Sequence, residues 1–302
     1  MSDMDARRSD LAGVCHIMVT PFTADEDLDE ASLRRVVDFA IGAGVGGLVA
    51  LGIMGEAHKL SDSERRRVLD VVVDQAAGRV PVVAGCSAEA TRVAVERARE
   101  AERAGAAAAM VAPPRNLKAP TLLRRHFHDV ADAAGLPVVV QDEPVTTGVE
   151  LPAELLAEIL AHPRVRYVKV EESPSPMKVT RILNAAPDAK CFGGLGGLYL
   201  FEELQRGAVG VMTGFGAPEV LVRIHELHRR GDVEGARSVF YRYLPLIRFE
   251  AQLGVGGVAI RKHVLAQRGV IATPVVRRPA GGVDDRTLKE LMELLTILEL
   301  DG

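Results

Sequence analysis

The chain has 302 residues, of which 48% are hydrophobic, and its 37 lysines and arginines against 41 aspartates and glutamates give a formal net charge of −4. This length is enough for a large core in one or two domains. No basic block predicts a nucleic-acid partner, and no apolar run approaches the roughly 18 residues that a membrane span needs. The first ten residues are polar and charged, unlike a secretory signal. We therefore expect a soluble, cytoplasmic protein that binds neither nucleic acid nor a membrane.

The three cysteines, Cys15, Cys86 and Cys191, lie far apart, each in or next to an apolar run. Their spacing is not that of metal ligands, so we expect buried free thiols in a reducing compartment. His126 and His128 lie two positions apart on an expected helix and therefore on different faces of it. We expect no metal site and no cofactor.

Short apolar runs alternate with longer segments of helical periodicity, and this pair recurs eight times along the chain. The first helical segment carries Leu33, Val36, Val37 and Ala40 on one face, and the second opens on the capping-box pattern of residues 61–64. The expected strands are 14–20, 48–51, 80–84, 106–111, 137–141, 165–170, 189–193 and 208–213. The expected helices between and after them are 29–43, 61–77, 88–104, 121–134, 152–160, 176–185, 198–206 and 218–230.

The expected strands are apolar throughout instead of alternating, which is typical of a parallel sheet buried on both faces. Eight strand–helix units in about 220 residues favour a closed (β/α)8 TIM barrel over the alternative, an open doubly wound sheet. No Gly-x-Gly-x-x-Gly motif follows the first strand, which disfavours a dinucleotide-binding fold. Beyond residue 230 only helical patterns follow, at 233–248, 258–268 and 284–298. We expect a barrel over residues 10–230 and a C-terminal helical extension, residues 231–302, packed on it.

A lysine stands inside the β-branched run 165–170, and Lys169 is followed two positions later by Glu171. Burying an ammonium group is costly, and a desolvated lysine loses its proton more easily and can attack a carbonyl as a free amine. Alternation along a strand puts Lys169 and Glu171 on the same face, with their Cα atoms roughly 7 Å apart. The alternative is an edge strand with a solvated Lys–Glu pair.

In a (β/α)8 barrel the active site lies at the carboxyl ends of the strands, and polar groups follow several of the expected strands. These ends carry Thr20, residues 52–56, 113–116 and 141–144, Lys169 with Glu171, and residues 193–197 and 212–214. Because Lys169 is one member of a converging set, the barrel favours a reactive lysine over a solvated one.

Several short motifs follow one another along nearly the whole chain. They are Thr20-Pro21-Phe22, Gly52-x-x-Gly55-Glu56, Leu60-Ser61 with Glu64-Arg65, the run 78–85, Leu136-Pro137-Val138, Pro144 with Thr147-Gly148, Lys169, and Gly207-Ala208-x-Gly210-Val211. Together they resemble the dihydrodipicolinate synthase / N-acetylneuraminate lyase superfamily of class I aldolases, which use a lysine Schiff base. The resemblance implies a (β/α)8 barrel with a helical C-terminal extension and a homotetramer. It also implies that Lys169 forms an imine with a 2-oxo acid such as pyruvate.

The chain departs from the family pattern around the expected site. The threonine pair that holds the substrate carboxylate in the family is Ile53 and Met54 here, so only backbone N–H groups of the segment that ends at Gly55 remain for that task. Gln141 replaces the strand-five tyrosine that serves as the family's proton shuttle.

Two further departures concern the second substrate of the synthases. A tyrosine after strand four is replaced by Arg115 or Pro114, and the arginine that synthases use for the second substrate's carboxylate falls at Thr146. These replacements disfavour the dihydrodipicolinate synthase reaction.

A second set of motifs resembles the branch of the family that contains 2-keto-3-deoxy-L-arabonate dehydratase. The set is Gln141-Asp142-x-Pro144, Lys169-x-Glu171, Gly207-Ala-x-Gly-x-Met212-Thr213-Gly214 and Pro245-Leu-Ile247 with Glu250-x-Gln252. That branch makes the same imine but eliminates water instead of making or breaking a C–C bond. The segment 52–60 matches the branch less well, which leaves the exact substrate open.

We expect Lys169, Glu171 and Gln141 to be the catalytic residues. For Glu171 three roles stay open: it transfers protons as a general acid/base, accepts hydrogen bonds from loop amides, or is solvated. Gln141 cannot ionise and is expected to orient water or the substrate. We expect Glu56 to be a structural acceptor that ties its loop. The expected substrate-binding residues are Ile53, Met54, Gly55, Arg115, Gly194, Met212 and Thr213.

The leading hypothesis is a Schiff-base-forming lyase, a dehydratase or an aldolase, that acts on a 2-oxo acid of the 2-keto-3-deoxy sugar acid class. One alternative is 4-hydroxy-tetrahydrodipicolinate synthase. The other is a non-catalytic barrel that only binds a 2-oxo acid.

Overall fold

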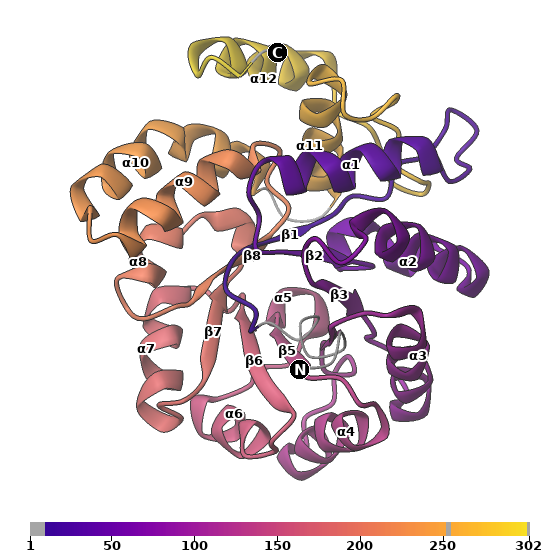
Figure 1. Ribbon diagram of the computed structural model, residues 1–302, viewed down its shortest axis with the longest axis vertical. Coiled ribbons are helices and arrows are strands. Elements are labelled where there is room, and N and C mark those ends of the chain that lie inside the picture. The colour runs from indigo at the N-terminus through magenta and orange to yellow at the C-terminus, as the bar shows by residue number, and fades with distance from the viewer. Residues whose placement is uncertain (1–9, 252–254, 301–302) are drawn as a thin grey trace.

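The computed structural model describes residues 10–251 and 255–300, and its centre is a closed barrel of eight parallel strands in chain order (Figure 1). The ring closes because β1 pairs with both β2 and β8. The strands are β1 (Gly13–Ile17), β2 (Gly47–Ala50), β3 (Val82–Gly85), β4 (Ala108–Val111), β5 (Val138–Asp142), β6 (Val165–Val170), β7 (Lys190–Gly193) and β8 (Gly210–Thr213). The predicted (β/α)8 barrel is confirmed, and the open doubly wound sheet is excluded.

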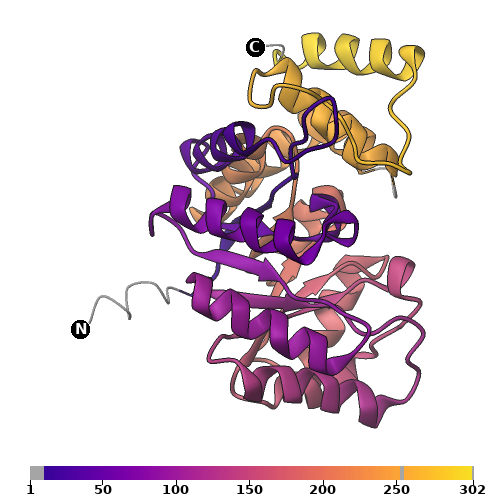
Figure 2. The same cartoon turned by 90° about the vertical axis from the view of Figure 1, so that its right-hand side faces the viewer.

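Helices surround the barrel, and in the part of the chain that the structure describes three more follow it (Figure 1). Those of the barrel are α1 (Glu30–Gly42), α2 (Asp62–Ala76), α3 (Thr91–Ala104), α4 (Pro120–Ala133), α5 (Pro144–Thr147), α6 (Ala153–Leu160), α7 (Ser175–Ala185), α8 (Leu200–Leu204) and α9 (Pro218–Arg229). The later helices are α10 (Val233–Glu250), α11 (Val255–Gln267) and α12 (Asp285–Ile297). Figure 2 shows α11 and α12 at one end of the molecule. The capping box predicted at Ser61 and Glu64 is present at the start of α2.

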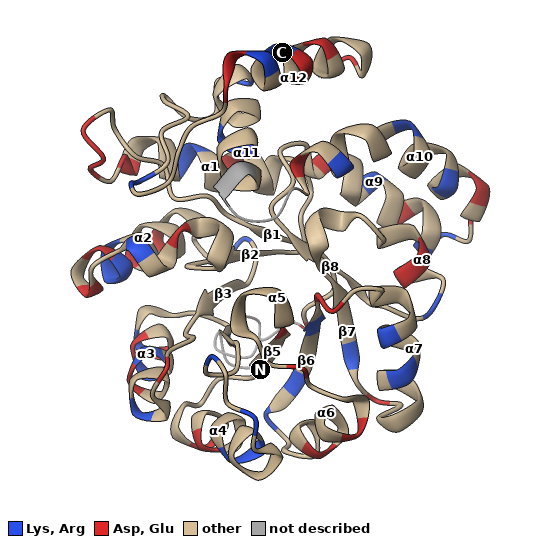
Figure 3. Ribbon diagram, turned by 180° about the vertical axis from the view of Figure 1, so that it is seen from behind, with Lys and Arg blue, Asp and Glu red and all other residues tan. Residues whose placement is uncertain are grey.

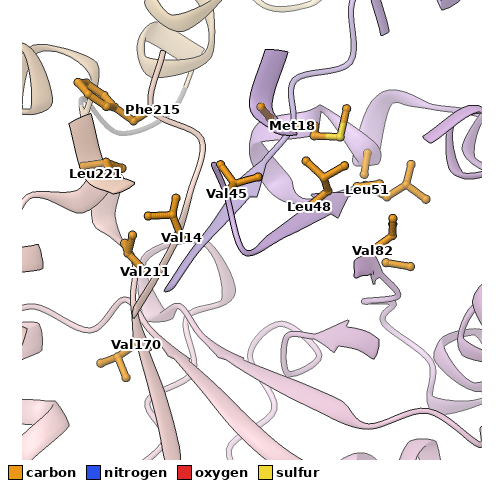
Figure 4. Packing of buried hydrophobic residues seen from close by; sticks show 14 of the residues in the cluster. Val14, Met18, Val45, Leu48, Leu51, Val82, Val170, Val211, Phe215 and Leu221 are labelled. Atoms are coloured by element: carbon orange, nitrogen blue, oxygen red, sulfur yellow. The ribbon is translucent and has the colours of Figure 1, made fainter. Parts of the chain in front are cut away.

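Two layers of apolar side chains explain why the strands are apolar throughout. In β1, Cys15 and Ile17 point into the barrel interior, while Val14 and the residue after the strand, Met18, pack against the surrounding helices. Figure 4 shows part of this outer layer, and Figure 3 shows that charged residues lie mostly on the helices and loops around the strands. A strand that is buried on both faces needs apolar residues at every position.

Cys15, Cys86 and Cys191 are buried and free, as the sequence predicted for the three thiols. Burial raises the pKa of each thiol to about 12, which keeps the thiols protonated. Within the described residues, no helix combines the length and apolar character that crossing a membrane would require.

The sequence placed most elements well and missed the short turns at the rim of the barrel. The strand predicted at 14–20 ends at Ile17, beyond which Met18 N–H still bonds to the carbonyl of Val49. Short 3₁₀ turns at Ile53–Gly55, Ala57–Lys59 and Leu195–Gly197 follow β2 and β7. Gln252, which belonged to one of the sequence motifs, lies outside the described residues.

Candidate functional site

Lys169 lies near the carboxyl end of β6, between β5 and β7, where its register partners are Gln141 and Phe192. Only 3% of its surface is exposed. β6 is therefore an interior strand of a closed ring, and the alternative of a solvated edge lysine is excluded.

The buried amine of Lys169 has a carboxylate partner on its own strand face. Lys169 Nζ donates a hydrogen bond of 2.6 Å to Glu171 Oε2, and Gln141 Nε2 donates to the same oxygen at 2.9 Å. The shared oxygen joins β5 to β6 and fixes the side chains of all three residues. The structure thus brings together the three residues predicted to be catalytic, as an amine, a carboxyl group and an amide in direct contact.

A cavity of about 280 Å³ opens at this point, at the carboxyl ends of the strands. Its walls come from the barrel rim, from the turn after β2 and from the C-terminal helices. Its polar and charged lining includes Gln141, Glu143, Thr146, Lys169, Glu171, Thr213, Glu56, His58, Lys59, Glu250 and Arg261. The volume is close to the lower end of ordinary ligand pockets and suits a small organic acid.

The turn after β2 supplies an apolar wall. Ile53 and Met54 line the cavity, and Met54 also packs against the apolar cluster of the C-terminal helices. Because they open a 3₁₀ turn, their N–H groups have no partner within that turn. Gly55 lies behind them, with its N–H bonded to Gly52 and its carbonyl accepting from Thr20 Oγ1 at 2.6 Å.

Gly194 acts on the site through Glu171. A Cβ atom on Gly194 would lie 2.3 Å from Glu171 Cγ, so only glycine leaves space for the Glu171 side chain. Leu195 and Gly196, in the turn that follows, line the cavity themselves.

Four predicted binding residues do not line this cavity: Gly55 and Gly194, described above, and Met212 and Arg115. Met212 is fully buried in the barrel interior. The residue of β8 that lines the cavity is Thr213, at the end of the strand. Arg115 is exposed, pairs with Glu89 at 2.6 Å and borders a neighbouring hollow of about 450 Å³ that also touches Gln141.

Glu56 accepts hydrogen bonds that hold its loop in place, as expected from the sequence. Its carboxylate accepts from Lys262 Nζ at 2.6 Å, from Lys59 Nζ at 2.8 Å and from Arg277 N at 3.0 Å. Burial lowers the pKa of Lys262 to about 8 even with Glu56 as its partner. These contacts tie the loop after β2 to the C-terminal helices.

The sequence placed Glu250 in a branch motif without giving it a role, and it did not identify Arg261; these two residues line the cavity from α10 and α11. For Arg261 the available signal was Arg261-Lys262, two adjacent cations inside a largely apolar helical run. Among the described residues, no group of three or more histidine, cysteine, aspartate or glutamate residues could hold a metal ion.

Comparison with known proteins matched residues 10–298 to the model of the dihydrodipicolinate synthetase family. A 4-hydroxy-tetrahydrodipicolinate synthase of Methanopyrus kandleri is 38% identical over 244 residues, covering 79% of this chain and 81% of the relative. An L-2-keto-3-deoxyarabonate dehydratase of Azospirillum brasilense is 32% identical over 294 residues, covering 95% of this chain and 94% of the relative.

Solved structures agree with these matches. The dihydrodipicolinate synthase of Rhodopseudomonas palustris is 33% identical, with a TM-score of 0.90 over 96% of this chain and 98% of that one. YagE of E. coli K12, solved in complex with pyruvate, is 28% identical, with a TM-score of 0.90 over 97% of this chain and all (100%) of that one.

Proposed function

Because this chain belongs to the dihydrodipicolinate synthetase family of lyases, we propose that it forms an imine with a 2-keto-3-deoxy sugar acid and eliminates water from it. The observation that carries the proposal is the contact between Lys169, Glu171 and Gln141 inside the cavity. A buried amine beside a carboxyl group supports imine chemistry. An amide in the place of the family's tyrosine supports a reaction in which the carboxyl group moves the protons.

The proposed reaction starts with attack of the Lys169 amine on the C2 carbonyl, whose oxygen leaves as water. The imine makes the C3 protons acidic, and the Glu171 carboxylate takes one of them. The electrons of that C–H bond then form the C3–C4 double bond as the C4 hydroxyl leaves, protonated by the Glu171 carboxyl group. Hydrolysis of the imine releases the unsaturated acid and restores Lys169.

Binding of the C1 carboxylate falls to the turn after β2. Ile53 and Met54 carry no polar side-chain groups, so their backbone N–H groups at the start of the turn are the donors available there. The apolar side chains of both residues exclude water from the imine, which favours its formation over hydrolysis. We propose the same place for the carboxylate of any 2-oxo acid that binds.

The second candidate is 4-hydroxy-tetrahydrodipicolinate synthase, which the identity to the Methanopyrus relative favours. Thr146 argues against it. This residue lines the cavity at the position where the resemblance places the synthase arginine, and its N–H is held by the Glu143 carboxylate at 2.9 Å. Without that arginine, the carboxylate of a second substrate lacks its partner.

A substrate panel tests the proposal. We expect purified protein to remove one water from at least one 2-keto-3-deoxy sugar acid, detected by mass spectrometry, and to be inactive with pyruvate plus aspartate semialdehyde. Release of pyruvate would instead identify an aldolase. Condensation with the semialdehyde would favour the synthase, and no turnover of any compound would favour a barrel that only binds 2-oxo acids.

Borohydride reduction in the presence of pyruvate tests the imine itself. We expect covalent addition at Lys169, located by peptide mass spectrometry, and none in the Lys169→Arg variant. Lys262 is the internal comparison because its pKa is about 8 while Glu56 and the carbonyl of Val275 hold its amine away from the cavity. Addition at Lys262 with Lys169 unmodified would overturn the assignment.

A further inference from the structure

Glu250 and Arg261 give the cavity a charged wall that the barrel does not supply. Glu250 is the last residue of α10, Arg261 lies in α11, and both line the cavity that holds Lys169 and Thr213. Glu250 is 0% exposed and Arg261 is 1% exposed. A buried ion pair of this kind is a poor way to stabilise a fold, because the desolvation of both charges offsets their attraction.

The segment after β8 is shaped to admit this pair. Gly216 N–H donates to both oxygens of Glu250, at 3.0 and 3.3 Å, and a Cβ atom on Gly216 would lie 2.8 Å from Glu250 Oε1. A Cβ atom on Gly214 would lie 3.1 Å from Arg261 Nη1. The two glycines therefore bring the pair against the backbone that directly follows Thr213.

Arg261 retains unused donors. Its Nε donates to Glu250 Oε2 at 3.3 Å, whereas its buried Nη1 has no hydrogen-bond partner among residues 10–251 and 255–300. A guanidinium has five N–H donors, and a buried charged donor without an acceptor is costly. An oxygen-rich ligand in the cavity supplies the acceptor that the described protein does not.

The charges around the cavity show which kind of oxygen fits. Three of the lining carboxylates already face cations, as the pairs Glu171 with Lys169, Glu250 with Arg261, and Glu56 with Lys59. The fourth, Glu143, accepts from a backbone N–H. No lining cation is in excess, so a second carboxylate on the ligand would lie beside Glu250 without a counter-charge. A hydroxyl group suits the pair, because it accepts from Arg261 and donates to Glu250.

We propose that Arg261 and Glu250 form a subsite that binds the hydroxyl groups at the far end of the substrate. The inference rests on the proposed function and narrows its substrate class to 2-oxo acids with a neutral, hydroxylated tail. Acids with a carboxylate at the far end are disfavoured.

Matched substrates test this specificity. The wild-type enzyme should show at least a tenfold higher kcat/KM for a 2-keto-3-deoxy acid that ends in a hydroxymethyl group than for the same acid oxidised to a terminal carboxylate. Equal values, or a preference for the diacid, would overturn the subsite.

Matched variants separate recognition from anchoring. Glu250→Gln and Arg261→Met should each lower kcat/KM for the hydroxylated acid about 10- to 100-fold and leave pyruvate trapping at Lys169 unchanged, since pyruvate has no tail. Arg268→Met is the control. Arg268 Nη1 donates a hydrogen bond of 2.9 Å to the carbonyl of Gly216, so it contacts the same glycine as Glu250, but Arg268 does not line the cavity. An equal loss with pyruvate and the hydroxylated acid, or the same loss in the Arg268 variant, would show that the pair only anchors the helices. If Arg261→Met does not fold, Glu250→Gln alone decides.

Competition distinguishes failure of this inference from failure of the proposed function. The hydroxylated acid should slow the trapping of pyruvate at lower concentration than the diacid does, and Glu250→Gln should remove that difference. If the difference is found but no acid is dehydrated, the dehydratase proposal fails and the subsite stands. If both acids compete equally, the subsite fails whatever reaction the enzyme catalyses.

Discussion

Glu171 has two neighbours that compete for one of its oxygens. Its Oε2 accepts from both Lys169 and Gln141, and Gly194 leaves the space in which the side chain turns toward them. Of these contacts, only that with Lys169 could be foreseen from strand alternation. The role of Gly194 is visible only when β7 is placed beside β6, because its effect is a close approach between the residues that follow these strands and not a property of its own segment.

Substitution of Glu171 separates imine formation from proton transfer. Glu171→Gln keeps the shape and the contact with Lys169 but cannot take up a proton, so we expect pyruvate trapping to persist while turnover falls about 10²- to 10⁴-fold. Glu172→Gln is the control for turnover rate and for the fraction of protein trapped with pyruvate. Glu172 is the next residue along the chain, but it pairs with Lys178 and does not line the cavity. Near-normal turnover of the true substrate by Glu171→Gln would make the carboxylate structural and move the proton path to Thr213 and water.

Arg261 and Glu250 mark the limit of what the sequence could tell at the scale of single residues. Strand ends converge by the geometry of the barrel, so Lys169, Gln141 and Thr213 can be grouped from the sequence alone. No comparable geometric rule places a helix that follows the barrel, and the local sequence of such a helix does not indicate which end of the barrel it covers.

At the scale of elements, the predictions were most accurate where a segment shows only one pattern of residue types, that of a strand or that of a helix. The run 165–170 matches β6 at both ends because strand-favouring residues, three valines and a tyrosine, occupy most of its positions. The segment after β2 instead folds into two short turns around Glu56, which has a left-handed conformation with a φ of 53°. Turns of this kind depend on contacts such as that of Glu56 with Lys262, which are distant in sequence.

The packing of α8 on β7 gives a prediction for pH dependence. Glu203 lies on α8, accepts from Ser175 Oγ of α7 at 2.6 Å, and has its Oε2 where a Cβ atom of Gly193 would be, only 1.7 Å away. Burial raises the pKa of Glu203 from 4.5 to about 8. The unfolded chain therefore loses this proton at lower pH than the folded one, and stability falls as the pH rises from 4.5 toward 8.

The isosteric variant Glu203→Gln isolates this effect. Between pH 6 and pH 9 the wild type should lose about 2–3 kcal/mol of unfolding free energy relative to the variant, measured by chemical denaturation at both values. Glu154→Gln, at an exposed position of α6, should follow the wild type. Parallel curves for the wild type and Glu203→Gln would mean that Glu203 is ionised in the folded protein at both values.

At the scale of the whole molecule, the prediction concerns how subunits assemble. The family resemblance implies a homotetramer, and aromatic residues make up only 4% of the sequence, so we expect aliphatic contacts between subunits. Two exposed apolar residues, Val93 on α3 and Leu122 on α4, border hollows that share Arg115. This face is therefore where we expect one subunit contact.

Sedimentation measures this assembly directly. Four copies of the 32.4 kDa chain should sediment as a particle of about 130 kDa. Leu122→Glu should shift it toward smaller species, because a charge in an apolar contact is desolvated without a partner. Ile297→Glu is the control: Ile297, the last residue of α12, is more exposed than Leu122, and the substitution should leave the tetramer unchanged. A monomer at all concentrations would refute the tetramer, and a tetramer that tolerates Leu122→Glu would place the contact on another face.

Because the hollow beside Arg115 also touches Gln141, loss of this subunit contact should lower turnover together with assembly.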